Sequence, residues 1–407
     1  MNDAPQATGA RRVKLLVYSH FFAPSIGGVE AIVLSLARGL AELRTPDGQL
    51  QFDVTVATQT PCGDFEDRSL PFRVVREPRL VALWRLVREC DVVHLAGPAL
   101  MPLLLARLAR KFVVVEHHGY QAVCLNGILV YQPDGLICPG HFQAGRYGKC
   151  LRCQTCENSV FRSIANLLLM IPRSRLSRGA ARNIAVSRRA LERSALPHSS
   201  VIYHGIEDPF PTDGTATSVG NASCKICFAF VGRFVSEKGI PILLQAARIL
   251  TRERHEFEVR LIGDGPERAK LEAIVRQERL ENCVRLTGYL TGSALAEALG
   301  DVRVVVMPSV WEETAGLAAI EQMMRGRLVI ASDVGGLGEI VGDAGLKFPP
   351  GDAGALADCM RKVLRDASLV DSCGRKARER ALHLFARERM LNEHADTYRD
   401  VLSQAKG

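Results

Sequence analysis

Two cations that follow a buried apolar run are the first residues in this sequence suited to chemistry. Arg233 and Lys238 come directly after the apolar run 227–231. A guanidinium can bind a diphosphate through two parallel hydrogen bonds, and an ammonium adds a point charge. The alternative is that both cations pair with acids on the surface, and this stretch alone leaves the two interpretations open.

A second charged stretch joins two glutamates to the expected start of a helix. The apolar run 302–307 stops at Pro308, and a helix is expected to begin near Gly316. The first N–H groups of a helix have no partner inside it and attract anions. The backbone groups expected to serve a ligand in this way belong to Thr314, Ala315, Gly316 and Leu317.

The two glutamates of this stretch are predicted to bind hydroxyl groups. Glu313 precedes the helix and is placed to accept hydrogen bonds from a sugar. Glu321 lies one to two turns inside the helix, where a carboxylate can bind both hydroxyls of a ribose. For Glu321 the alternative is an i,i+4 pair with Arg325, which would stabilise the helix by only a few tenths of a kcal/mol.

Glycine-containing turns follow other expected strands. Gly27-Gly28 stand between the apolar run 13–19 and an amphipathic helix, and Gly263 and Gly265 follow the run 258–262. Glycine lets the backbone approach an anion or a sugar closely at a helix N-terminus. Ordinary tight turns would have the same composition. No G-x-G-x-x-G opens either series of strands, which disfavours a nicotinamide-dependent dehydrogenase.

Four clustered cysteines predict a metal site in the long segment 120–159. Cys138, Cys150, Cys153 and Cys156 suit tetrahedral Zn²⁺, and we expect a structural zinc there. Free or redox-active cysteines and an iron–sulfur cluster are the alternatives. Cys124 and His141 are substitute ligands. The pair Cys224 and Cys227 has similar spacing but runs into an expected core strand.

A basic stretch at 162–193 contains eight arginines against one acid, Glu192, and includes the apolar run 167–171. Basic and apolar faces together predict contact with an anionic membrane surface or a phosphate-bearing acceptor. Solvated arginines on ordinary helices are the alternative. Nucleic acid is not expected as a partner, because no aromatic residues alternate with the arginines and no binding motif is present.

The order of apolar runs predicts two doubly wound α/β domains. Continuously apolar runs suit parallel strands buried on both faces, and segments with helical periodicity separate them. In the first half these runs are 13–19, 52–58, 91–95, 112–116, 184–187 and 201–203; in the second they are 227–231, 258–262, 284–286, 302–307 and 328–332. The polar stretch 212–223 is predicted to be the linker between them.

Composition sets the wider limits. A chain of 407 residues exceeds the usual size of one hydrophobic core, and 47% hydrophobic with 24% charged residues is ordinary for a globular protein. The first twelve residues are not followed by an apolar signal core, and no apolar run is long enough to span a bilayer. We therefore expect a cytoplasmic protein, free or peripheral at the inner face of the membrane, with reduced cysteines.

These motifs, in this order, resemble the retaining glycosyltransferase family four, also called glycosyl transferases group 1. The resemblance rests on four stretches: Gly27-Gly28-Val29-Glu30, Val231-Gly232-Arg233 with Glu237-Lys238-Gly239, Gly263-Asp264-Gly265-Pro266, and Glu313 with Glu321. It implies the GT-B fold, in which two Rossmann-like domains with parallel sheets face a cleft. The expected domains are 1–210 on the acceptor side, 224–385 on the donor side, and a helix at 386–407 that packs back on the first domain.

The resemblance also implies roles for individual residues. Arg233 and Lys238 would neutralise the diphosphate of a UDP- or GDP-sugar, Glu313 would contact the sugar, and Glu321 the ribose. The family's catalytic-region histidine is matched to His118, because it directly precedes Gly119. The acceptor would be a saccharide or a polyprenyl-linked molecule, as in the synthesis of cell-surface polysaccharides or glycolipids.

The implied reaction uses no cofactor. Fixed cations and helix-end N–H groups would stabilise the negative charge that develops on the leaving diphosphate, in place of a divalent metal. The family's usual proposal for retention is attack on the same face, with the leaving phosphate taking the acceptor's proton. The alternatives in function are another GT-B enzyme, such as a nucleotide-sugar epimerase or a phosphorylase, and a non-catalytic nucleotide-sugar-binding protein.

Two departures from the family pattern affect these expectations. Ala315 stands where the family commonly has Phe, which changes how the sugar would be packed. The stretch 203–206 reads Tyr-His-Gly-Ile where Pro-Asn-Gly-Ile or Pro-Asn-Gly-Val is common, so the crossing between the domains is less well defined than the donor site.

Overall fold

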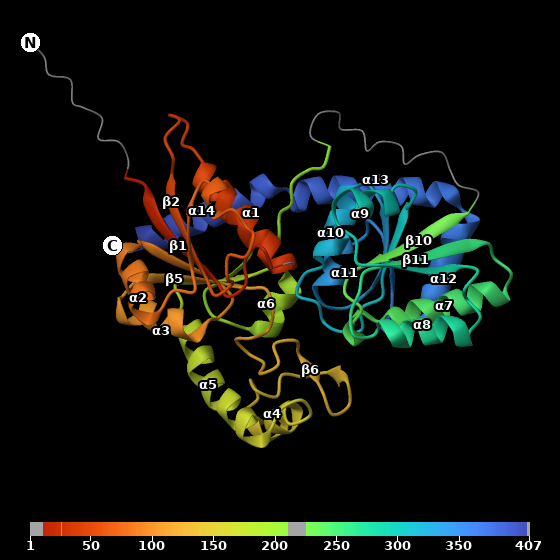
Figure 1. The fold of residues 1–407 in the computed structure, drawn as a ribbon, viewed down its shortest axis with the longest axis horizontal. Coiled ribbons are helices and arrows are strands. Elements are labelled where there is room, and N and C mark those ends of the chain that lie inside the picture. The colour runs from red at the N-terminus through yellow and green to blue at the C-terminus, as the bar shows by residue number, and fades with distance from the viewer. Residues whose placement is uncertain (1–10, 26, 211–224, 405–407) are drawn as a thin grey trace, which may run out of the picture.

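The protein folds around two parallel β-sheets that lie side by side along its longest axis (Figure 1). The structure is a computed structural model that describes residues 11–25, 27–210 and 225–404. The expected linker 212–223 and Cys224 lie outside the described residues.

The first sheet has seven parallel strands in the order β3-β2-β1-β4-β5-β8-β9. Successive residues of β1 point to opposite faces and enter different cores. Leu15 and Val17 pack with α1 and α14 on one face, and Leu16 and Tyr18 pack with α2 and α3 on the other. The elements are β1 (Val13–Ser19), α1 (Gly28–Glu42), β2 (Phe52–Thr58), η1 (Asp67–Ser69), β3 (Arg73–Arg76), α2 (Leu80–Glu89), β4 (Val92–Ala96), α3 (Leu100–Leu108), β5 (Phe112–His117), β8 (Arg182–Ala185), α6 (Arg188–Ser194) and β9 (Ser199–Val201).

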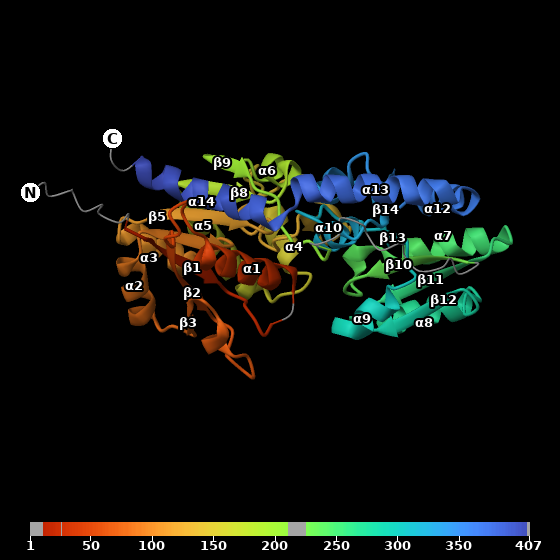
Figure 2. The same ribbon diagram turned by 90° about the horizontal axis from the view of Figure 1, so that it is seen from above.

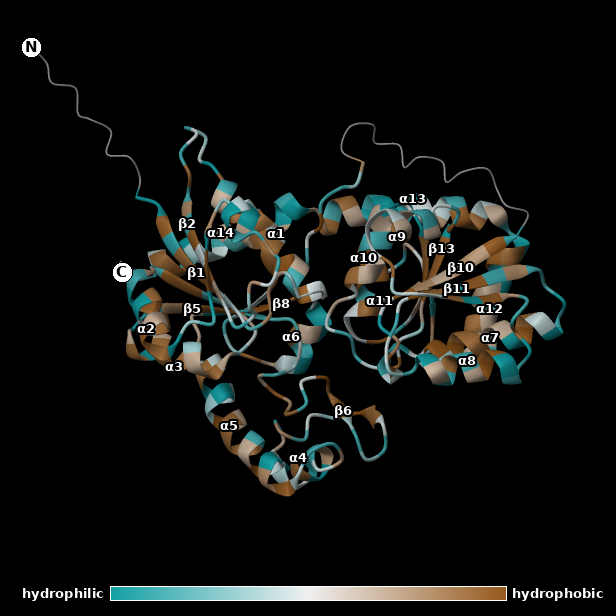
Figure 3. Ribbon diagram, in the orientation of Figure 1, coloured by the Kyte–Doolittle hydropathy of each residue, from teal (hydrophilic) through white to brown (hydrophobic). Residues whose placement is uncertain are grey.

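The second sheet has six parallel strands in the order β12-β11-β10-β13-β14-β15. The cores on its two faces contain α7, α8 and α12 on one side and α10, α11 and α13 on the other. The apolar strands run between these helix layers (Figure 3). The elements are β10 (Ile226–Val231), η2 (Ser236–Lys238), α7 (Ile240–Arg252), β11 (Phe257–Ile262), α8 (Arg268–Gln277), β12 (Val284–Gly288), α9 (Gly292–Ala298), β13 (Val304–Met307), α10 (Leu317–Met324), β14 (Leu328–Ser332), α11 (Gly335–Val341), β15 (Leu346–Phe348), α12 (Ala353–Arg365) and α13 (Ala367–Leu384).

The predicted α/β class with two doubly wound parallel sheets is confirmed, and every strand expected from an apolar run is present. The bounds shift by up to two residues, as for β8, which was expected at 184–187. The sequence analysis missed β3 and β15, which lie at sheet edges. Edge strands are short and partly exposed, so they lack the continuous apolar run that marks a central strand.

The end of the chain crosses from the second domain to the first. α13 packs on the second sheet, and α14 (Arg387–Ser403) continues along the first, as Figure 2 shows from above. Met390, Leu391 and Tyr398 of α14 are buried in the core that β1 and α1 share. The two connections are held together where Ile206 exchanges backbone hydrogen bonds with Phe385 and Arg387.

The segment between β5 and β8 forms a projection below the two domains in Figure 1. It contains the antiparallel pair β6 (Val130–Tyr131) and β7 (Leu136–Ile137), followed by α4 (Tyr147–Gln154) and α5 (Val160–Arg178). A small core of its own joins it to α6. None of the described helices has both the length and the apolar composition needed to cross a bilayer.

Candidate functional site

The N-termini of α1 and α10 meet between the two sheets. A Cβ atom added to Gly28 would lie 3.1 Å from Cδ2 of Leu317, the first residue of α10. No side chain caps the N-terminus of α10. The predicted turn at Gly27-Gly28 and the predicted anion site at 314–317 are therefore neighbours, although they come from different domains.

Lys238 and Glu313 form an ion pair beside this junction. Lys238 Nζ lies 2.8 Å from Glu313 Oε1, and the Ser309 hydroxyl donates to the same oxygen. The side chains are 28% and 12% exposed, so both remain within reach of a ligand. The two residues were predicted to act on different parts of one molecule, and the structure places them in direct contact.

Arg233 extends from the same strand exit as Lys238. It is exposed, and its side chain forms no hydrogen bond or ion pair with any residue that the structure describes. Its loop is fixed by the neighbouring one, because Phe234 donates its backbone N–H to Asp264 O at 2.8 Å. A Cβ on Gly263 would lie 1.8 Å from Gly232 O at a positive φ of 145°, so this contact requires glycine.

Glu321 lies on α10 and faces the surface. It forms no ion pair with Arg325, the structural alternative considered for it. Neighbouring protein atoms still withdraw its carboxylate from water, and this burial raises its pKa, while the charge of Arg325 acts in the opposite direction. Glu321 is thus exposed, unpaired by other described residues and available to a ligand.

His118 points into the protein rather than into open solvent. Its side chain is 6% exposed, and Nδ1 lies 3.0 Å from Nε2 of His204. Burial lowers the pKa of His118, and the charge of Glu116 only partly opposes this. The backbone of His118 faces the second domain, because its carbonyl accepts a 2.8 Å hydrogen bond from the Thr314 hydroxyl.

Behind His118 lies a buried carboxylate surrounded by imidazoles, which the sequence analysis missed. Glu116 Oε2 is 3.3 Å from His94 Nε2, 3.4 Å from His394 Nε2 and 3.7 Å from His118 Nε2. Burial opposes ionisation of Glu116, yet His118 and His394 hold its pKa well below the usual value. Burial would likewise lower the pKa of His394, but the Glu116 carboxylate raises it.

The spacing in this cluster would also suit a cation. His94, Glu116 and His394 have ligand atoms within 4.8 Å of one another, and so do Glu116, His118 and His204. A protonated His394 would supply the positive charge that balances the Glu116 carboxylate without a metal. Its Nδ1 already lies 2.8 Å from Met390 O, so Nε2 is the nitrogen that faces Glu116. We therefore interpret the cluster as an ion pair that fixes His118 from behind. The only sequence signal for this cluster was the presence of His94 and Glu116 inside apolar runs expected to be buried strands.

Contacts across the junction involve further residues to which the sequence analysis gave no role. The Glu339 carboxylate accepts the backbone N–H groups of Arg188 and Arg189, each at 3.0 Å, and the Tyr203 hydroxyl at 2.6 Å. The Ser187 hydroxyl donates to Thr314 O at 2.5 Å. These bonds fix α6 and the segment after β9 against α11 and the loop that precedes α10.

The structure divides the predicted basic stretch 162–193 between two surfaces. α5 carries exposed Arg162, Arg175 and Arg178, whereas Arg193 on α6 binds Glu312 at 2.6 Å and the Cys138 carbonyl at 2.6 Å. The basic stretch therefore does not form one surface, and contact with an anionic membrane stays a prediction. Only the α5 part projects away from the junction (Figure 1).

The four cysteines predicted as metal ligands are also divided. Cys138, Cys150 and Cys153 are buried around one cavity of the projection, but Cys156 is exposed and does not line it. Cys124, considered only as a substitute, lines the cavity together with His141.

Comparison with known proteins finds similarity to glycosyltransferases. Residues 218–380 match the family described as glycosyl transferases group 1. The chain is 37% identical over 152 residues to a 2-deoxystreptamine glucosyltransferase and 28% identical over 174 residues to an alpha-D-kanosaminyltransferase, both of Streptomyces kanamyceticus. The matches cover 37% and 42% of this chain and only 39% and 45% of those relatives.

Solved structures resemble the whole chain. Anabaena Alr3699/HepE in complex with UDP has a TM-score of 0.70 at 18% identity and covers 96% of this chain and 100% of its own. The sucrose-phosphate synthase of Thermosynechococcus elongatus has a TM-score of 0.70 at 22% identity, with 97% and 100% coverage. At these identities the likeness shows the fold, which is that of GT-B proteins.

Proposed function

We propose that this chain, whose residues 218–380 match the glycosyl transferases group 1 family, is a retaining glycosyltransferase that uses a nucleotide-sugar donor. The observation that carries the proposal is the contact between Lys238 and Glu313, with exposed Arg233 at the same strand exit. A cation for a diphosphate and a carboxylate for a sugar thus lie beside one helix N-terminus.

Donor binding would change the partner of Lys238. In the structure the Lys238 ammonium donates a hydrogen bond to the Glu313 carboxylate, so each group balances the charge of the other. A diphosphate carries more negative charge than one carboxylate and would compete for Lys238. The same exchange would free the Glu313 oxygens to accept hydrogen bonds from hydroxyls of the transferred sugar.

Charge stabilisation would then drive the chemistry. As the bond between the anomeric carbon and the phosphate breaks, negative charge develops on the diphosphate. Arg233, Lys238 and the uncapped N–H groups at the start of α10 would stabilise that charge. For retention, the acceptor hydroxyl would attack from the face that the diphosphate leaves and pass its proton to the leaving phosphate.

A UDP-sugar is the first donor to test, with GDP-sugars as the second choice. Anabaena Alr3699/HepE, whose fold is similar, is described in complexes with UDP and with UDP-glucose. Glu321 lies exposed on α10, where its carboxylate would bind the two ribose hydroxyls that all these donors share.

The acceptor is proposed to be linked to a lipid and reached from an anionic membrane surface. Along α5, Phe161 is 88% exposed and Leu168 is 62% exposed. Arg162 and Arg175 are exposed on the same helix. Apolar side chains that enter the headgroup boundary and arginines that bind anionic lipids are the two features of an interfacial helix.

The proposal is tested by thermal unfolding with a panel of UDP-, GDP- and ADP-sugars. A donor at 100-fold its dissociation constant should add about 2.7 kcal/mol to the free energy of unfolding. Slow release of nucleotide without an added acceptor would exclude a non-catalytic binding protein. If no nucleotide sugar stabilises the protein, the proposed donor class is wrong.

A further inference from the structure

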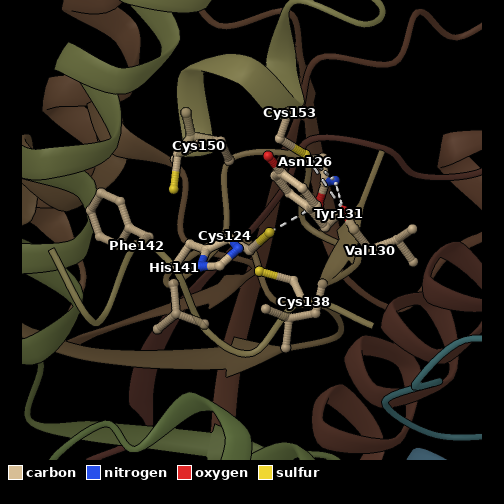
Figure 4. Close-up of a pocket in the computed structure, with 12 residues that line it drawn as sticks. Cys124, Asn126, Val130, Tyr131, Cys138, His141, Phe142, Cys150 and Cys153 are labelled. Carbon is tan, nitrogen blue, oxygen red and sulfur yellow. Dashed lines mark hydrogen bonds between the residues drawn. The ribbon is translucent and has the colours of Figure 1, made fainter. Parts of the chain in front are cut away.

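Four cysteine residues line one cavity in the projection between β5 and β8. Cys124, Cys138, Cys150 and Cys153 are each at least nine-tenths buried, and His141 lies beside them (Figure 4). The space between the side chains is about 20 Å³, enough for one water-sized occupant.

The cavity is built from separate pieces of chain. Cys124 lies in the turn after Tyr120, Cys138 follows β7, and Cys150 and Cys153 stand one helical turn apart on α4. Three separate pieces of chain therefore meet at one cavity. This arrangement is typical of small metal-binding modules, where each short segment supplies one or two ligands.

Polar groups around the cavity hold the sulfur of Cys153, which also lies 3.6 Å from the Val130 carbonyl oxygen. The Cys153 Sγ accepts the backbone N–H of Gln132 at 3.4 Å and the side-chain amide of Asn126 at 3.6 Å. The Asn126 amide also donates to Val130 O at 2.7 Å, which fixes its orientation. N–H donors of this kind orient the side chains that bind a metal and stabilise their negative charge.

Cys156 does not belong to this group. It is exposed, and its thiol donates to Arg152 O of its own helical turn at 3.5 Å. The sequence contains two overlapping Cys-x₂-Cys pairs, 150/153 and 153/156. Only the first pair has both thiols on the buried face of α4.

The projection contains little regular structure that could order it. Apart from α4, the segment 120–159 contains only two strands of two residues each, and its own core is small. Such a segment buries little apolar surface to offset its loss of conformational entropy. The small core is itself built around Cys124, Cys138 and Cys153.

We propose that Cys124, Cys138, Cys150 and Cys153 bind one structural Zn²⁺ as four thiolates. Binding releases the four thiol protons to solvent. No three of these ligand atoms lie within 4.8 Å of one another, so the ion draws the side chains inward as it binds. The site orders the projection and takes no part in the transfer reaction, so it stands independently of the proposed donor site.

The first test is elemental analysis of the full chain purified without a metal-affinity column. We expect about one zinc per chain in the wild type. Cys124→Ser should lose it, and the matched control Cys156→Ser should keep it. Zinc that is retained in Cys124→Ser and lost in Cys156→Ser would overturn the ligand set. Iron instead of zinc, or no metal in the wild type, would overturn the site.

A second test uses the wild-type chain and does not depend on how the variants fold. Zinc is removed with a chelator and replaced by Co²⁺, whose visible spectrum reports the number of thiolate ligands. A spectrum typical of four thiolates in a tetrahedron is expected. A spectrum of mixed nitrogen and sulfur ligands would bring His141 into the site and contradict the proposed set.

Discussion

Replacing Lys238 by alanine separates the role of this residue in catalysis from its role in folding. In the structure the ammonium holds Glu313 at 2.8 Å, and Ser309 donates to the same carboxylate oxygen. Lys238→Ala removes the cation but leaves Glu313 its hydroxyl partner. The folded state should therefore survive while the positive charge at the expected diphosphate position falls.

The two effects differ in size. Partly exposed ion pairs contribute little to folding, so we expect a loss of about 1 kcal/mol in the free energy of unfolding. Removing one fixed group that stabilises developing negative charge typically raises the barrier by about 3–4 kcal/mol. At about 1.4 kcal/mol for each factor of ten, kcat should fall by about two to three orders of magnitude.

The assay is release of nucleotide from the donor identified by thermal stabilisation, with urea unfolding measured on the same samples. Lys270→Ala is the matched control, because Lys270 also pairs with a glutamate, Glu267, at 2.7 Å, but on the surface of α8. We expect wild-type turnover in this control.

Wild-type turnover in folded Lys238→Ala would remove Lys238 from the mechanism. If Lys270→Ala lost as much activity as Lys238→Ala, the effect would not be specific to the strand exit. Loss of folding in Lys238→Ala would show that the ion pair stabilises the protein far more than a partly exposed pair should.

Three further expectations follow from the geometry. Glu321→Ala should raise KM for the donor and leave kcat nearly unchanged, since ribose contacts are alike in ground and transition states; a fall in kcat alone would contradict this. Burial lowers the pKa of His117 to about 4 and of His204 to about 3, below the unfolded value of about 6.5. Below pH 6.5 the unfolded chain thus binds more protons than the folded protein. The free energy of unfolding should therefore fall as the pH falls from 6.5 to 4, by up to about 1.4 kcal/mol per pH unit for each histidine. Urea unfolding that shows no loss of stability from pH 7 to pH 5 would refute this. Phe161→Ser with Leu168→Ser should weaken flotation with anionic liposomes, and flotation of the wild type that did not depend on anionic lipid or salt would reject the proposed membrane contact.

Local sequence patterns determined the architecture and the strand exits. Buried parallel strands are continuous apolar runs, and each run fixes where its strand ends, so Arg233, Lys238 and Glu313 could be placed at strand exits from spacing alone. Glycine positions such as Gly263 were also readable, because close backbone contacts exclude a Cβ atom. These features depend only on residues near in sequence.

The tertiary structure decided which distant residues become partners. Glu116 meets His394 only because α14 returns to the first domain, and no periodicity records that contact. Cys124 replaces Cys156 in the cavity because the fold of the projection, rather than the spacing of the cysteines, determines which thiols are buried. Periodicity specifies which face of an element is buried, whereas the identity of the residue packed against it depends on how the elements assemble.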